Sequence, residues 1–382
     1  MDLTRRDTTK PGRGAPHGAA QPREYRAEGR EDDGPGRPLG WLSVRAVVIS
    51  APGGPHVLQV RDVPGPTLPD DPSAGGPGAD TRVRQLLVDV EAAGVNRADL
   101  LQRQGVYPPP PGAPPWPGLE AAGVVRAATG PAGDGPAVGD RVAVLLAGGG
   151  YAEQVVVPAD LALPVPADLS PVEAAALPEA LATVWSNLRE ADARPGETLL
   201  VRGGSGGVGS VAVQVARLLG MRVVATAGGP ERVARVAALG ADVALDHRAD
   251  DLADQVLAAT DGRGVDVVLD VLGAGGLEHN VRVLARGGRL VVIGLQKGRR
   301  GTLDLGALME RRARVIGTTL RSRDPQDKAR IMAEVRREVW PFVVDGRLRP
   351  VVHATLGLDE APRAHELLAS GEVFGKLVLV TR

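Results

Sequence analysis

The chain has 382 residues, a length that allows two domains and a sizeable core. Lys and Arg number 45 against 46 Asp and Glu, so the formal net charge is −1 and no basic excess points to nucleic acid. Cysteine is absent, which excludes disulfides, thiolate nucleophiles and cysteine-ligated zinc. No apolar run reaches transmembrane length and no apolar signal-peptide core is visible, so we expect a cytoplasmic protein that does not enter a membrane.

The first part of the chain predicts a domain of short strands. Residues 1–43 are rich in Pro, Gly, Arg and acidic side chains and poor in large apolar residues, so we expect a disordered extension. Apolar runs bounded by turn residues then predict strands at 45–50, 59–63, 85–92, 123–126, 141–146 and 151–157. Between them lie an inserted loop at 64–81, a short polar helix at 96–104 and an irregular, proline-rich stretch at 107–118. Short strands with little helix indicate an antiparallel, β-rich domain.

From Ser170 the pattern changes to alternating strands and helices. A helix is predicted over 171–188, with Ser170 as its N-cap and Glu173 three residues later. Apolar runs separated mostly by helical stretches then predict strands at 198–201, 222–227, 242–246, 265–270, 288–293 and 314–319. Apolar strands that alternate with helices predict an α/β, doubly wound parallel sheet with both faces covered.

The C-terminal tail does not continue this alternation. Residues 327–344 and 356–370 predict helices, the second capped by Asp359, and residues 376–380 predict a last strand. We expect this tail to pack on the N-terminal domain, which makes that domain discontinuous. The expected divisions of the chain are 1–43, 44–167, 168–320 and 321–382.

One stretch, TLLVRGGSGGVG at residues 198–209, has the pattern of a dinucleotide-binding turn. A strand leads into glycines spaced G-x-G-x-x-G, and apolar residues at helical spacing follow up to Gly220. In this motif the glycines allow a tight turn, close approach of the backbone to a pyrophosphate, and contact between helix and strand. The helix N-terminus then faces the anion. The expected pyrophosphate site comprises Gly204, Ser205, Gly206, Gly207, Val208 and Gly209.

Four separate segments resemble one family. VNRADLLQRQGVYPPPPGAPPWPGLEAAGVV at 95–125, RGGSGGVGSVAVQVARLLG at 202–220, GTTLRSRD at 317–324 and FGKLVL at 374–379 are similar to the zinc-free quinone oxidoreductase (zeta-crystallin-like) branch of the medium-chain dehydrogenases/reductases. The resemblance covers residues 44–382 apart from the 64–81 insertion. It implies a Rossmann cofactor domain inserted in a β-rich GroES-like substrate domain.

The residues after the second predicted parallel strand favour NADP(H) over NAD(H). That strand runs into Gly228 and Gly229, with no carboxylate at its tip to bond the ribose hydroxyls of NAD. Arg232 follows, and an arginine can hold a 2′-phosphate bidentately. The resemblance implies that a basic residue here serves NADP, and that His247, after the third strand, lies near the same phosphate. A solvated Arg232 and a plain loop histidine are the alternatives.

Asn96 and Tyr107 are the expected catalytic residues, and the resemblance is what points to them. Asn96 can hold a carboxamide or an acceptor oxygen, and Tyr107 offers a phenolic donor and a ring for a planar substrate. The alternatives are a turn-forming Asn96 and a Tyr107 ring that lies on prolines. Asp99 is expected to start or brace the short helix rather than to act in catalysis.

Further cofactor contacts are expected where the parallel strands end, because ligands bind at their carboxyl ends. Thr183 corresponds to the family position beside the nicotinamide, with ordinary helix packing as its alternative. The remaining expected cofactor contacts are Leu272, Gly273, Ile293, Gly294, Leu320, Phe374, Gly375 and Lys376.

No metal site is expected. Glu120 lies where zinc-dependent relatives carry a glutamate after a ligand histidine, but Leu119 replaces that histidine. The six histidines are scattered without ligand spacing, so we expect Glu120 to be structural.

The leading functional hypothesis is NADPH-dependent, metal-free reduction of quinones or related α,β-unsaturated carbonyls, small molecules to which the cofactor passes a hydride. A thioester enoyl reductase shares the zinc-free fold and is the second enzyme hypothesis. The third is an NADPH-binding protein without catalysis, such as an RNA-binding or stress protein, although the near-zero net charge disfavours nucleic acid. Because residues 315–320 predict a strand at an open sheet edge, we also expect a homodimer.

Overall fold

The computed structural model describes residues 43–68, 84–130 and 135–381. The expected disordered extension at 1–43 lies almost wholly outside this range, and so does most of the inserted loop at 64–81. The sequence division into four ranges stays a prediction.

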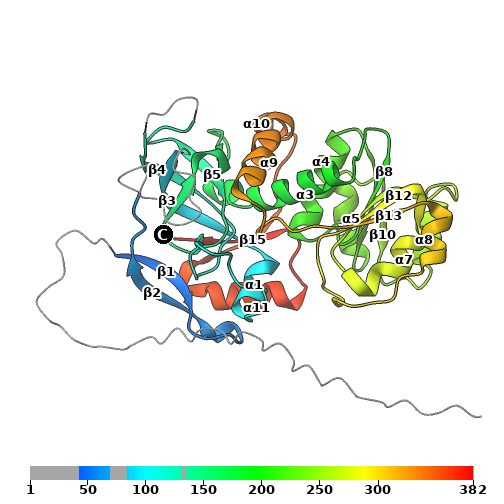
Figure 1. Cartoon of the computed structure of the whole chain (residues 1–382), viewed down its shortest axis with the longest axis horizontal. Helices are drawn as coiled ribbons and strands as arrows, with labels where there is room; N and C mark the ends of the chain where they lie inside the picture. Colours follow the sequence, from blue (N-terminus) through cyan, green and yellow to red (C-terminus); the bar gives the residue numbers. More distant parts are fainter. Residues whose placement is uncertain (1–42, 69–83, 131–134, 382) are drawn as a thin grey trace, which may run out of the picture. The chain divides into compact units, whose positions relative to one another are not determined.

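A six-stranded parallel sheet carries the glycine-rich turn (Figure 1). Neighbouring strands pair in parallel throughout, and all six lie where the sequence predicts them, within a few residues. Their order across the sheet is β10 (Val243–Asp246), β9 (Arg222–Ala227), β8 (Thr198–Val201), β11 (Val265–Asp270), β12 (Leu284–Val292) and β13 (Arg314–Gly317). The doubly wound α/β fold is therefore confirmed.

The central strands β9, β8 and β11 of this sheet are buried on both faces. Successive residues of β8 belong to different apolar clusters: Leu199 lies in one and Leu200 in the other. Helices α3 (Pro178–Glu190), α4 (Gly207–Leu218) and α5 (Pro230–Ala238) contribute to the first cluster. Helices α6 (Leu252–Ala258) and α7 (Leu277–Arg282) contribute to the second. Burial on both faces explains why the strands read as continuous apolar runs.

A second, mostly antiparallel sheet combines the N-terminal strands with the end of the chain. Figure 1 shows the red C-terminal strand β15 among the blue-green strands of this sheet, and β15 pairs antiparallel with β3. The sheet order is β14 (Val352–Gly357), β15 (Lys376–Val380), β3 (Gln85–Val95), β4 (Glu120–Ala128), β5 (Arg141–Leu145) and β7 (Ala162–Pro164), with β6 (Gln154–Pro158) also paired to β3. A separate hairpin joins β1 (Ser43–Ile49) and β2 (Leu58–Pro64). This pairing brings Lys376 next to the strand that ends at Val95.

Three predicted helices differ from those observed, twice because of proline. The segment 171–188 is two helices, α2 (Pro171–Ala174) and α3, because Pro178 begins a new helix. The segment 327–344 is also two, α9 (Pro325–Glu338) and α10 (Trp340–Val344), with Pro341 at the start of the second. The prediction of a helix from 356 was wrong at its start: Leu356 lies in β14, and α11 spans Ala361–Ser370. The expected capping box of Ser170 and Glu173 is present.

Candidate active site

The turn from Gly204 to Gly209, called the nucleotide turn below, fits a dinucleotide. The Gly204 N–H donates to the Thr226 carbonyl (2.7 Å), which ties the turn to the neighbouring strand β9. A Cβ on Gly209 would lie 2.0 Å from the Gly203 carbonyl oxygen, so this close contact between helix and strand requires glycine. Gly206 is the N-cap of α4, and the first bond of the helix runs from the Ser210 N–H to the Gly206 carbonyl. The N–H groups of Gly207, Val208 and Gly209 therefore have no partner within the helix and can bind an anion.

Buried polar atoms without partners lie beside the nucleotide turn. Arg202 follows β8, and Asp270 ends β11, which is the neighbouring strand at the point where the strand order reverses. In the described part of the chain, Arg202 Nε, Asp270 Oδ1 and both amide atoms of the buried Asn280 have no hydrogen-bond partner. Ligands of doubly wound sheets bind in the crevice at such a reversal.

The segment Phe374–Lys376 lies against the nucleotide turn, as the cofactor prediction requires. The Gly375 N–H donates to the Ser205 carbonyl (2.8 Å), and Gly206 and Gly375 form a β-bridge. Gly375 has φ +87°, and a Cβ there would lie 2.1 Å from the Val351 carbonyl oxygen, so no other residue fits without a shift. The Arg235 guanidinium stacks over the Phe374 ring at 3.8 Å from its centroid.

Lys376 also reaches into the second sheet, where it forms a polar cluster with Asn96 and Glu120. Its Nζ donates to the Asn96 Oδ1 (2.7 Å) and to the Glu120 Oε1. The Asn96 Nδ2 donates to the same Glu120 oxygen (2.8 Å). Lys376 is 3% exposed and Glu120 is fully buried, so the two charges neutralise each other away from water. Asn96, Glu120 and Lys376 are called the polar cluster below.

The polar cluster changes the expected roles of two residues. Both amide atoms of Asn96 are occupied by protein partners, so Asn96 holds Lys376 and Glu120 in place. Glu120, expected to be structural, contacts the lysine of the predicted cofactor segment and accepts from the Glu179 N–H (2.9 Å). It therefore belongs to the candidate site itself.

Asp99 braces the short helix α1 (Arg97–Arg103), as expected. Its Oδ2 accepts from the Asn96 N–H (2.8 Å), which completes a capping box, and its Oδ1 accepts from the Gly118 N–H (3.0 Å). The Tyr151 hydroxyl donates to Oδ2 (3.1 Å) and lies 3.3 Å from the His365 Nε2. Burial raises the pKa of Asp99 to about 6 despite these bonds, and burial with the nearby Arg103 lowers the pKa of His365 to about 3.

Tyr107 is held by Arg321, a residue of the GTTLRSRD segment that sequence reasoning did not single out. The guanidinium lies over the Tyr107 ring, 5.4 Å from its centroid, and donates to the Tyr107 carbonyl (3.2 Å). It also donates to the Ala147 carbonyl and to the Gln102 Oε1, both at 2.7 Å. Burial raises the pKa of Tyr107, Glu179 raises it further, and Arg321 acts in the opposite direction. Arg321 therefore fixes the proline-rich loop that carries Tyr107.

The tip of β9 is basic, with a carboxylate that the sequence reasoning did not foresee. A Cβ on Gly228 would lie 2.9 Å from the His247 ring and 3.3 Å from the Arg248 guanidinium, so both basic side chains cover the glycine. The Arg232 Nη1 donates to the Gly371 carbonyl (2.7 Å). The Asp246 Oδ2 accepts from the Gly229 N–H (3.0 Å), and its Oδ1 from the Arg248 N–H (3.0 Å). These backbone bonds lower the pKa of Asp246 and occupy its oxygens.

The remaining predicted cofactor residues lie on the loops after β11, β12 and β13 and on α3. Gly273 follows Leu272, and its N–H donates to the Asp270 Oδ2 (2.7 Å). The Ile293 N–H donates to the Asp270 carbonyl (2.8 Å), and a Cβ on Gly294 would meet the Val271 carbonyl oxygen at 2.8 Å. These two loops therefore touch. Leu320 is buried after β13, and the Thr183 carbonyl accepts from the Asn187 side chain (2.7 Å).

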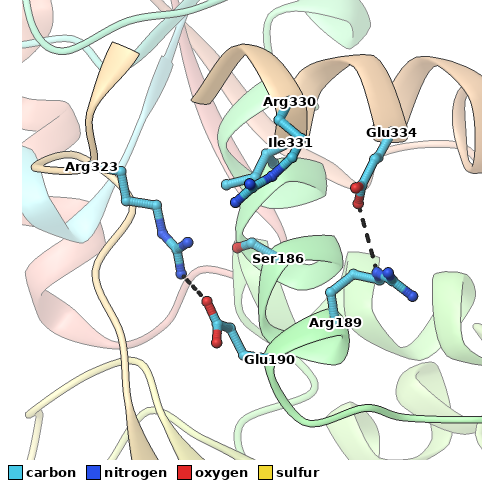
Figure 2. A pocket seen from close by; sticks show the side chains of 7 residues that line it. All are labelled: Ser186, Arg189, Glu190, Arg323, Arg330, Ile331 and Glu334. Atoms are coloured by element: carbon cyan, nitrogen blue, oxygen red, sulfur yellow. Dashed lines mark hydrogen bonds and ion pairs between the residues drawn. The ribbon is translucent and has the colours of Figure 1, made fainter. Parts of the chain in front are cut away.

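A pocket of about 370 Å³ lies between α3 and α9, and none of the predicted site residues lines it (Figure 2). Its walls carry paired charges: Arg323 bonds Glu190 (3.0 Å) and Arg189 lies 3.7 Å from Glu334. The lining residues are Ser186, Arg189, Glu190, Arg323, Arg330, Ile331 and Glu334. Because these charges are already paired and no predicted residue lines the pocket, we assign it no role.

Comparisons with known proteins decide the family. Residues 82–167 match the alcohol dehydrogenase GroES-like domain and residues 207–337 match the zinc-binding dehydrogenase model. The chain is 30% identical to the quinone oxidoreductase of Lama guanicoe over 90% of this chain and 99% of the relative. The chain belongs to the quinone oxidoreductase family. It is thus an oxidoreductase of the medium-chain dehydrogenase/reductase type, as the resemblance implied.

Two solved structures and one larger protein complete the comparison. A quinone oxidoreductase from Thermus thermophilus, described with its NADPH complex, is 34% identical with a TM-score of 0.72 and covers 89% of this chain and 100% of that one. An NAD-dependent alcohol dehydrogenase is 35% identical with a TM-score of 0.75, and the match covers 88% of this chain and 100% of that one. A phenolphthiocerol/phthiocerol polyketide synthase subunit of Mycobacterium tuberculosis is 34% identical over 87% of this chain, which spans only 14% of that subunit.

One of the two matched domain families is named for zinc binding. Within residues 43–68, 84–130 and 135–381, no three His, Cys, Asp or Glu side chains group as a metal site would need. In the same ranges no helix has the length and apolar character to cross a membrane. The cytoplasmic location stays a prediction.

Proposed function

We propose that this oxidoreductase uses NADPH to reduce quinones or related α,β-unsaturated carbonyls by hydride transfer. The observation that supports it best is the position of Lys376. Its neighbour Gly375 bonds the nucleotide turn at Ser205, and its own ammonium contacts Asn96 and Glu120. One segment therefore joins a dinucleotide cradle to a buried polar cluster, as a site for cofactor and acceptor requires.

The residues of the chain have separate tasks in this mechanism. A bound nicotinamide supplies the hydride. The N–H groups at the start of α4 would hold the pyrophosphate, beside the loops after β11 and β12. Arg321 fixes the loop that carries Tyr107, whose phenol would bond the acceptor oxygen and whose ring would orient a planar acceptor. The proposal gives no role to a metal ion, since a lysine ammonium contacts the Glu120 carboxylate.

The preference for NADPH rests on the tip of β9. Two guanidinium groups lie on the segments that follow β9 and β10: Arg232 in the first turn of α5, and Arg248 beside Gly228 and Gly229. The same segments carry Glu231 and Asp246, and the Asp246 oxygens are bonded to backbone N–H groups, while burial lowers the pKa of His247. The preference therefore rests on the two arginines, which can bind a 2′-phosphate bidentately. Arg232 bonds Gly371 in this structure, so it would exchange that carbonyl for the phosphate.

Steady-state NADPH oxidation with 1,4-benzoquinone, 9,10-phenanthrenequinone and crotonyl-CoA tests the proposal. We expect turnover with the quinones. Turnover with the thioester alone would favour an enoyl reductase, a candidate supported by the 34% identity to the polyketide synthase subunit. Tight NADPH binding without oxidation by any acceptor would favour the non-catalytic alternative.

We also propose that the protein is a homodimer that continues the parallel sheet across β13. This strand is at one end of the sheet, and Val315 on it is 40% exposed. Leu305 and Met309, on the neighbouring helix α8 (Leu305–Arg311), are 62% and 76% exposed. An apolar edge of this kind invites pairing with another strand. Light scattering should give a dimer for the wild type and a monomer for Val315→Lys; a monomeric wild type would contradict the proposal.

A further inference from the structure

Glu179 is a carboxylic acid at the candidate site with no role so far. It lies in the first turn of α3, directly after Pro178, and its N–H donates to the Glu120 Oε2 (2.9 Å). The backbone of Glu179 is thus bonded to the polar cluster. Its own carboxyl accepts no hydrogen bond from any described residue and is partly exposed. A carboxyl bonded to nothing, next to a buried ion pair, is free to act on a ligand.

Titratable groups from several other segments face this carboxyl. Glu120 on β4 and Asp99 on α1 are acidic, whereas Lys376 on β15 and Lys328 on α9 are basic. The charge of Glu179 in turn acts on Tyr107 and on the Arg321 guanidinium that covers the Tyr107 ring. The Lys328 Nζ donates to the Arg321 carbonyl (2.5 Å), which attaches α9 to the same group of residues. The Glu179 carboxyl is therefore close enough to Tyr107, Arg321 and the polar cluster for their charges to interact.

The helix places Glu179 on the same side as a predicted cofactor residue. Glu179 and Thr183 are four residues apart in α3, and residues at that spacing lie one above the other on a helix. Thr183 is the expected neighbour of the nicotinamide. With Thr183 beside the nicotinamide, as the resemblance implies, a group one helical turn before it would lie close to an acceptor that receives the hydride.

The protonation state of Glu179 suits a donor. Partial burial raises its pKa to about 8, and the neighbouring Glu120 carboxylate contributes to this rise, against the opposing effects of Lys376 and Lys328. A glutamate that only stabilised a helix N-terminus would be ionised, because the helix dipole favours the anion. The raised pKa of Glu179 instead favours the protonated form at neutral pH.

We propose that Glu179 is the general acid that protonates the acceptor oxygen after hydride addition. As the hydride forms its new bond, an electron pair moves onto the acceptor oxygen. The O–H bond of Glu179 breaks, the oxygen gains the proton, and the carboxylate is reprotonated from solvent. NADPH supplies the hydride, so this inference rests on the proposed function. Tyr107 then orients the acceptor, and its raised pKa makes it the weaker acid of the pair.

The test compares Glu179→Gln with the wild type and with Glu190→Gln, which changes the last residue of the same helix. The pH dependence of kcat and KM is measured with NADPH and 9,10-phenanthrenequinone. Wild-type kcat should fall as the pH rises through about 8, because the acid form is lost. Glu179→Gln should lower kcat by about 100-fold or more at neutral pH, remove this dependence and leave the NADPH KM unchanged. Glu190→Gln should match the wild type.

Two further results keep the inference separate from the proposed function. Glu179→Asp should retain part of the activity and a loss of kcat at alkaline pH. If Glu179→Gln keeps the wild-type pH profile, the acid role is wrong although the reductase function stands. If the wild type reduces no acceptor, the proposed function is wrong. The protonation of Glu179 can still be measured, by comparing the infrared spectra of the wild type and Glu179→Gln at pH 7. A band of a protonated carboxyl that only the wild type shows would report the proton on Glu179.

Discussion

The nucleotide turn and the polar cluster are built in opposite ways. The turn is continuous in sequence and acts through backbone: glycines, N–H groups without a partner in the helix, and a helix N-terminus. The polar cluster takes Asn96, Glu120 and Lys376 from three separate strand ends and acts through buried charge. A site formed by backbone groups is disrupted when a side chain is added to it. A site formed by buried charges is disrupted when one of the charges is removed, so the two regions should respond differently to substitution and to pH.

Removal of one charge from the polar cluster should have the largest effect on stability. Lys376→Met leaves the fully buried Glu120 carboxylate without its cation, which costs about 3–5 kcal/mol. Urea denaturation measures this loss. The double variant Lys376→Met/Glu120→Gln should regain most of it, because no unpaired charge remains. A double variant as unstable as the single one would show that shape, not charge, holds the cluster.

Addition of a side chain to the nucleotide turn should reduce the free energy of unfolding by less than Lys376→Met does, but it should weaken NADPH binding. Gly209→Val places carbon atoms against the Gly203 carbonyl, which a Cβ would approach to 2.0 Å, and overpacking costs about 1–3 kcal/mol. The forced shift of the turn should weaken NADPH binding by about 100-fold, as measured by fluorescence titration. Gly317→Ala, where the added Cβ meets nothing within 4 Å, is the matched control. Unchanged NADPH affinity in Gly209→Val would remove the turn from the cofactor site.

The basic side chains at the tip of β9 should affect only one cofactor. Arg232→Ala and Arg248→Ala should each raise the NADPH KM about tenfold, equivalent to about 1.4 kcal/mol, and barely change the NADH KM. Steady-state kinetics with NADPH and with NADH measures the effect of each substitution on the two KM values. Equal effects on the two cofactors would exclude that arginine from phosphate recognition.

Mild acid should reduce the stability of the protein through His365, which lies near the polar cluster, and not through the nucleotide turn. His365 is neutral when folded, with a pKa of about 3 against 6.5 for the free group, so its stabilising contribution is complete above pH 6.5. As the pH falls below 6.5, the unfolded chain binds a proton that the folded chain does not. The wild type should then lose about 1 kcal/mol more than His365→Gln between pH 6.5 and 5.5, and the loss approaches about 1.4 kcal/mol per pH unit at lower pH. Denaturation at pH 6.5 and 5.5 measures this difference, with the exposed His56→Gln as control.

The same contrast explains what could be predicted from the sequence. The turn was predictable because its strand, glycines and helix are consecutive, and so were the six parallel strands, which are continuous apolar runs. Asn96 and Lys376 were named through resemblance, but their contact with Glu120 depends on the pairing of β15 with β3. Arg321 and Glu179 carry no local pattern, because their roles arise from segments that the fold brings together. A charged residue directly after a helix-starting proline was the one available sign of Glu179.

Single-turnover oxidation of bound NADPH by 9,10-phenanthrenequinone shows whether the turn and the polar cluster form one site for hydride transfer. We expect the quinone to oxidise bound NADPH in one step, and more slowly when the transferred hydrogen at the nicotinamide C4 is deuterium. Bound NADPH that stays reduced with this quinone and with the other acceptors would contradict this expectation.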